Sequence, residues 1–162
     1  MAAGPTYEPI ATTTLGSAQA DVTLSAISGS YTDLVIVANI IRTASSDLEF
    51  QLNGDTGNNY STTFLFGDGS SAGSVRTTSD NAGNAGFSNS TNISTMIMQL
   101  QNYSNTTTNK TILVRNSPAN NSVSALVTLY RSTSAITSIK FIPTAGNINT
   151  GTTFTIYGIA AA

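Results

Sequence analysis

The chain has 162 residues and a formal net charge of -2, and its polarity comes from 26 Thr, 21 Ser and 16 Asn, with only 14 charged residues and no His, Cys or Trp. The missing side chains exclude imidazole acid-base chemistry, thiol nucleophiles, disulfides and thiolate metal sites. Short neutral polar side chains favour strands and turns over helices, so the composition indicates a β-structured protein that assembles or binds rather than a catalyst.

Alternation of apolar and polar residues is the dominant pattern, and no segment has a convincing helical period. It predicts about ten strands, at residues 9–15, 20–27, 32–41, 47–53, 60–66, 94–102, 109–116, 121–131, 135–142 and 152–159. Turn residues separate these segments at spacings of 8 to 14 residues. This spacing is typical of an all-β fold, an antiparallel β-sandwich of the jelly-roll type.

Three of these strands carry more specific expectations. The apolar run from Leu34 to Val37 does not alternate, which predicts a strand buried on both faces. In residues 47–53, the apolar side chains are expected to point inward and Asp47, Glu49 and Gln51 outward. The Asn-Gly turn that follows favours a hairpin between this strand and residues 60–66. In residues 121–131, Val123, Ala125, Val127 and Leu129 share one face.

Residues 67–92 differ in kind, because Gly, Ser, Asn, Thr and Asp dominate and few apolar residues occur. Loops of this length are uncommon inside a domain and are usually functional or disordered. We expect a long polar loop here, with at most a short strand near Val75, that faces another subunit or a receptor. Residues 1–8 are expected to form a short lead-in.

Length and charge limit the partners. Leu, Ile, Val and Phe make up 37 residues, about 23% of the chain, which suffices for the core of a single domain spanning 1–162. The charges are scattered, so no basic run favours nucleic acid, and no stretch of about 18 apolar residues predicts a membrane span. The start lacks the features of a secretion signal. Weak charge repulsion favours a homo-oligomer.

Candidate chemistry is sparse, and a structural role is expected for each group. Asn53, Asp55, Gly57 and Asn59 place oxygens at alternate positions as in a calcium loop, but Phe64 stands where a bidentate Glu belongs, so a turn is favoured and a cation stays open.

Catalysis would need other groups. Asp47 and Glu49 share a strand face, which leaves a carboxylate-dependent hydrolase open, although solvated charge is the expected role. A serine nucleophile would need Lys110, Lys140 or a carboxylate as its base. Of six Tyr residues, most are expected in the core with the hydroxyl anchored to backbone, and Tyr60 and Tyr103 are expected to be exposed.

Five turn and strand-edge motifs carry a resemblance to a known family. They are residues 7–11 (YEPIA), 29–34 (GSYTDL), 53–61 (NGDTGNNYS), 102–107 (NYSNTT) and 131–137 (RSTSAIT). Together they resemble a family of virion structural proteins of tailed bacteriophages, including cyanophages, over nearly the whole chain. The resemblance implies a trimeric part of the outer surface of the phage particle, made in the host cytoplasm, with no catalytic residues, cofactor or metal.

The position in the virion has two interpretations. The first expected strand begins within about ten residues of Met1, whereas a tail fibre normally carries an attachment segment and a repetitive shaft ahead of its terminal domain. This favours a capsid decoration (cement) protein that stabilises the head by binding the major capsid protein, with Tyr7, Pro9 and the run from Leu34 to Val37 suited to subunit contacts. The alternative is a tail fibre or receptor-binding adhesin domain that contacts tail proteins and recognises host surface glycans.

Overall fold

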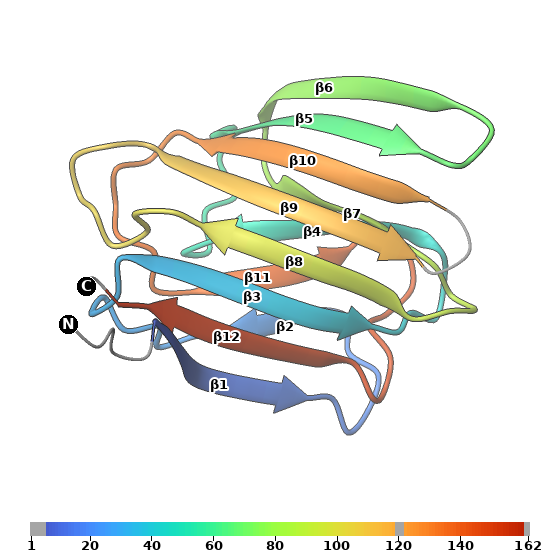
Figure 1. The fold of residues 1–162 in the computed structure, drawn as a ribbon, viewed down its shortest axis with the longest axis horizontal. Coiled ribbons are helices and arrows are strands. Elements are labelled where there is room, and N and C mark those ends of the chain that lie inside the picture. The colour runs from blue at the N-terminus through green and yellow to red at the C-terminus, as the bar shows by residue number, and fades with distance from the viewer. Residues whose placement is uncertain (1–5, 119–121, 161–162) are drawn as a thin grey trace.

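Two antiparallel sheets pack face to face (Figure 1). The structure is a computed structural model that describes residues 6–118 and 122–160. Its strands are β1 (Tyr7–Thr14), β2 (Val22–Leu24), β3 (Asp33–Ile40), β4 (Ser46–Leu52), β5 (Tyr60–Gly67), β6 (Ala72–Asp80), β7 (Gly83–Ser88), β8 (Ser94–Leu100), β9 (Lys110–Pro118), β10 (Val123–Tyr130), β11 (Ile139–Pro143) and β12 (Thr153–Ile159). Within the described residues, no helix is long and apolar enough to cross a membrane.

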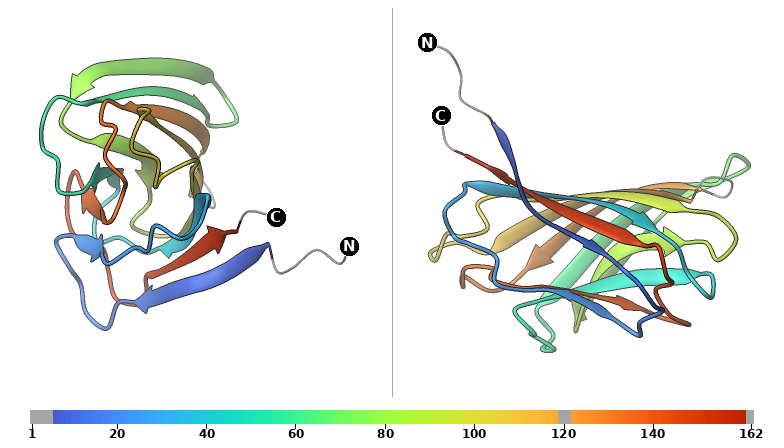
Figure 2. Two further views of the ribbon diagram at one scale, coloured as in Figure 1. Left: turned by 90° about the vertical axis from the view of Figure 1, so that its left-hand side faces the viewer. Right: turned by 90° about the horizontal axis from the view of Figure 1, so that it is seen from below.

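The two sheets differ in width. The large sheet has eight strands in the order β1-β12-β3-β8-β9-β10-β5-β6, and the small sheet has four in the order β2-β11-β4-β7. Figure 2 shows the large sheet curving around the small one. The expected all-β antiparallel sandwich is confirmed. The small sheet covers only part of one face of the large sheet, so the rest of that face and the whole opposite face have no strand of the small sheet against them, and the candidate sites lie on these surfaces.

The core lies between the sheets and is built largely from the side chains that alternation places inward. Leu48, Phe50 and Leu52 of β4 are fully buried, as expected, while Asp47 and Glu49 stay partly exposed. On the facing sheet, Leu34 and Ile36 of β3 are also fully buried, as are Met96 and Met98 of β8. Phe141 and Phe154 stack across the sandwich with ring centroids 4.8 Å apart. Val35 is only 6% exposed, so the run in β3 is buried toward both faces at this position.

The expected hairpin between residues 47–53 and 60–66 is wrong. β4 pairs with β11 and β7 in the small sheet, whereas β5 pairs with β10 and β6 in the large sheet. The turn between them therefore carries the chain from one sheet to the other. Tyr60, at the start of β5, anchors the crossing because its hydroxyl accepts a hydrogen bond from the Leu52 N–H at 2.9 Å. An Asn-Gly turn specifies a reversal of the chain, but it does not specify which strands pair afterwards.

The expected long polar loop at residues 67–92 is also wrong, since most of it forms β6 and β7. Backbone pairing rather than apolar burial holds β6, which is an edge strand with seven of its nine residues exposed, six of them consecutive. β7 has small buried residues, including Gly83 and Ala85, which allow it to pack closely against its neighbours in the core. Neither strand shows the apolar alternation from which a strand can be predicted.

The expected lead-in at 1–8 overlaps β1, which begins at Tyr7, and residues 1–5 lie outside the described residues.

β10 turns its more apolar face outward. Val123 is 62% exposed and Val127 46% exposed, whereas Ser124 and Thr128 on the opposite face are buried. The buried hydroxyls are paired: Thr128 Oγ1 lies 2.8 Å from Thr62 Oγ1, and Ser124 Oγ donates to the Asn116 carbonyl at 3.3 Å. Buried polar groups are tolerated when they are hydrogen-bonded, so β10 forms part of the core with hydroxyls and leaves its aliphatic side chains outside.

Candidate functional site

The turn at residues 53–59 is closed by its own side chains. The Asp55 carboxylate accepts hydrogen bonds from the Gly57 N–H at 2.7 Å, from Asn59 Nδ2 at 2.8 Å and from the Tyr130 hydroxyl at 2.9 Å. Burial opposes ionisation of Asp55, but these three hydrogen bonds outweigh it and lower the pKa of the carboxyl. This geometry accounts for the oxygen-rich spacing as a turn, which was the favoured interpretation.

Replacing Asp55 with Asn is expected to lower the free energy of unfolding by about 1 kcal/mol at pH 7, because an amide accepts weaker hydrogen bonds from these donors. The folded-state pKa of Asp55 is depressed. The carboxylate therefore stabilises the fold fully above the pKa of an Asp in the unfolded chain, and this stabilisation is lost as the pH falls from that value through the folded-state pKa. Urea unfolding should therefore show the difference between wild type and Asp55→Asn at pH 7 and show it shrinking at about pH 3. A difference that is constant with pH would contradict this account.

The candidate catalytic carboxylates lie on the outward side of β4. Asp47 Oδ2 accepts a hydrogen bond from Asn84 Nδ2 of β7 at 3.1 Å. Burial, together with the nearby carboxylates of Asp80 and Asp47, raises the pKa of Glu49. The structure thus brings Asp47 and Glu49 to one face as the sequence indicates, and adds Asp80, which sequence reasoning missed because it lies in the segment expected to be a loop. The absence of catalysis stays a prediction.

The two lysines considered as bases both have structural partners. Lys110 is 2% exposed, and its Nζ donates to the carbonyls of Asn105 at 2.7 Å, Thr108 at 2.8 Å and Thr133 at 3.2 Å. Lys140 forms an ion pair with Asp21 at 3.1 Å. Lys110 therefore joins two loops at one end of the sandwich, and burial lowers its pKa.

The expectation that Tyr60 and Tyr103 are exposed is wrong, because both are fully buried. The Tyr103 hydroxyl donates to the Ser28 carbonyl, and the Tyr60 hydroxyl donates to the Asp55 carbonyl at 3.2 Å. Polar neighbours in the sequence do not imply an exposed ring at these positions, because the surrounding Asn and Ser residues form the loops that each ring anchors. Tyr7 is the exposed tyrosine, at 56%, and its ring packs edge-on against Tyr157.

An exposed apolar surface lies on the outer face of the large sheet, over β5, β10, β9 and β8. We call it the outer apolar face. It comprises Leu65, Ile97, Leu113, Val123, Ala125, Val127 and Leu129. Sheet register places these side chains together, because Ala125 pairs with Leu65 on one side and with Arg115 on the other, and Arg115 pairs in turn with Ile97.

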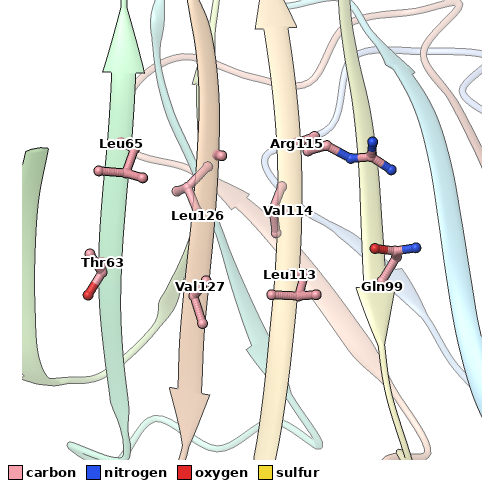
Figure 3. A pocket seen from close by; sticks show the side chains of 9 residues that line it. Thr63, Leu65, Gln99, Leu113, Val114, Arg115, Leu126 and Val127 are labelled. Atoms are coloured by element: carbon pink, nitrogen blue, oxygen red, sulfur yellow. The ribbon is translucent and has the colours of Figure 1, made fainter. Parts of the chain in front are cut away.

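A hollow of about 240 Å³ indents this face, with Thr63, Leu65, Gln99, Leu113, Arg115, Ala125 and Val127 around it. Figure 3 shows the Arg115 side chain extending away from β9 so that its guanidinium lies over β8. The small Ala125 side chain sits between Leu65 and Arg115, which explains why the surface is indented there. Within the described part of the chain, the Arg115 guanidinium has no ion-pair partner.

Comparisons with known proteins show the fold alone. No family model matches the sequence, and no curated protein matches it. Among solved structures, the exo-inulinase of Aspergillus awamori is similar, with a TM-score of 0.50 and 14% identity over 94% of this chain and 29% of the enzyme. A galectin of Caenorhabditis elegans has a TM-score of 0.37 and 8% identity over 93% of this chain and 96% of its own. The shared feature is a β-sandwich of the jelly-roll class.

Proposed function

We propose that this chain is a non-enzymatic virion structural protein of a tailed bacteriophage, a decoration protein that binds the major capsid protein through the outer apolar face. The observation that carries the proposal is the group of half-exposed aliphatic side chains on neighbouring strands, with Leu65 at 54%, Val123 at 62%, Val127 at 46% and Leu129 at 37% exposure. A contiguous apolar surface of this kind is typical of a protein contact, and covering it recovers hydrophobic free energy.

The charge of this face favours a different protein over a second copy. Arg115 lies among Leu65, Ala125 and Ile97 in the sheet register. If two copies packed these faces together about a two-fold axis through the centre, their guanidinium groups would approach each other, and like charges across an interface cost free energy. A surface that presents a carboxylate among apolar side chains would instead form a charge-assisted hydrogen bond with Arg115. The proposed partner surface on the capsid protein has that chemistry.

The copy number of the protein in purified phage particles tests this function. We expect gel densitometry to give copies comparable with those of the major capsid protein, because a decoration protein repeats over the whole shell. Copies in the tens or fewer would contradict the proposal and favour a tail-associated adhesin. Assembly as a homotrimer rests on the sequence resemblance and stays a prediction.

A further inference from the structure

A groove separate from the outer apolar face lies between the β5–β6 hairpin and the β7 side of the small sheet. Two adjoining hollows of about 280 and 230 Å³ form it, and both are lined by Asp47 and Phe64. The first is completed by Phe66, Asp68, Phe87 and Ser122, and the second by Thr62, Val75, Thr77 and Asn84. The groove exists because β5 and β6 continue the large sheet past β7, the edge strand of the small sheet (Figures 1 and 2).

One side of the groove is aromatic. Phe64 and Phe66 point from β5 to the same face, and their rings stack with centroids 5.3 Å apart and planes 29° apart. Gly73 of β6 makes room for Phe66, because a Cβ at this position would lie 2.8 Å from Phe66 Cζ. Val75, the partner of Phe64 in β6, is 54% exposed. These groups form a flat apolar platform that is open to solvent.

The other side is polar. Asn84 fixes Asp47 by donating to Oδ2 at 3.1 Å, and Asn84 is itself held because its Oδ1 accepts from the Gly86 N–H at 2.6 Å. A carboxylate has capacity for further hydrogen bonds beyond this one, so Asp47 presents acceptor sites to the groove. Thr77 of β6 lines the same hollow as Asp47.

The two carboxylates give the groove a negative charge that is only partly offset. Arg42 is buried, and burial lowers its pKa while the Asp47 carboxylate partly offsets this effect, but its guanidinium donates to Ser46 Oγ and the Ala145 carbonyl and not to Asp47. The other carboxylate of the groove, Asp68, accepts hydrogen bonds from the backbone N–H and the hydroxyl of both Ser70 and Ser71, at 2.7 to 3.2 Å. Asp68 therefore stays ionised, but most of its acceptor capacity is used within its own turn, which leaves Asp47 as the carboxylate of the groove with acceptor sites to offer.

We propose that this groove binds a neutral saccharide. A sugar ring has an apolar C–H face that matches the phenyl platform and hydroxyl groups that donate to Asp47, which is the combination of apolar lining and few placed polar groups that small-ligand sites use. An anionic ligand would meet two carboxylates, and a purely apolar ligand would leave Asp47 desolvated with the Asn84 amide as its one side-chain donor. A cationic ligand is the competing occupant, because both carboxylates remain charged, and a tri-arginine peptide distinguishes it from a sugar in the test.

Ligand-observed NMR with maltose, cellobiose, lactose and N,N′-diacetylchitobiose tests this inference. We expect saturation transfer to at least one of them at millimolar concentration, and calorimetry should show affinity lowered about 10-fold in Phe66→Leu, which keeps apolar volume but removes one flat ring of the platform. Asp47→Asn should lower affinity by a similar factor, because a charge-assisted acceptor is lost. Thermal unfolding of both variants verifies that they fold.

Leu65→Thr is the matched control, because Leu65 lies on the opposite face of β5 from Phe64 and Phe66 and should leave saccharide affinity unchanged. The inference is overturned if none of the four disaccharides binds, if both groove variants bind as the wild type does, or if a tri-arginine peptide binds in place of the sugars. It does not depend on the decoration role, since the copy number in particles and the affinity for free sugars are measured separately.

Discussion

A Leu65→Thr/Val127→Thr double variant is expected to bind phage heads that lack the protein about 100-fold more weakly than the wild type does. Both residues are about half exposed and border the hollow in the outer apolar face. Each substitution removes aliphatic surface that docking would bury, and together they forfeit about 3 kcal/mol at roughly 0.8 kcal/mol per methylene plus the cost of covering a hydroxyl. Threonine is β-branched, so the strands themselves should keep their stability.

Cosedimentation of purified protein with such heads measures this effect, and Val75→Thr provides its control. Val75 has the same exposure as Leu65, 54%, and lies on the neighbouring strand, but it faces the groove on the opposite side of the sheet. Val75→Thr should therefore attach to heads as the wild type does. Equal loss in both variants, or full attachment of the double variant, would show that the outer apolar face is not the docking surface.

The fold class could be predicted because the strands that make the centre of the sandwich alternate strongly. Leu48, Phe50 and Leu52 show this, since one period-2 pattern determines both the strand and its buried face. Strand pairing could not be predicted from the same pattern. The chain crosses between sheets at residues 53–59, and that crossing depends on contacts such as the hydrogen bond between Tyr130 and Asp55, 75 positions apart in the sequence.

The candidate surfaces were hidden for a different physical reason. In β10 the apolar residues share one face, as the sequence indicates, but this face points outward, because the core accepts Ser124 and Thr128, whose hydroxyls find partners on β9 and β5. The outer face of Val123 and Val127 is thus a consequence of tertiary pairing that no single strand encodes. The groove depends on β6 and β7, whose polar and glycine-rich sequence carries no alternation. The available signal was the unusual cluster of Phe64 and Phe66 just before that segment.

Gly83→Ala is expected to lower the free energy of unfolding by about 3 kcal/mol, because the added methyl group would overlap a buried ring. A Cβ at Gly83 would lie 2.3 Å from Phe50 Cζ and 2.7 Å from Cε1. Phe50 pairs with Gly83 across β4 and β7, is fully buried, and contacts the Tyr60 ring edge-on with centroids 6.3 Å apart. Because the ring is fully buried and packed against Tyr60, the added methyl group is expected to push β4 and β7 apart.

Urea unfolding of Gly83→Ala and Gly16→Ala compares a crowded glycine with an open one. A Cβ at Gly16 meets no atom within 4 Å, and this residue is exposed, so its substitution should change stability by no more than about 0.5 kcal/mol. Equal stability of the two variants would mean that Phe50 can leave its place between the sheets at little cost. In that case the contact between β4 and β7 would be loose, and the position of Asp47 relative to Asn84, which shapes the wall of the groove, would not be fixed by the core beneath it.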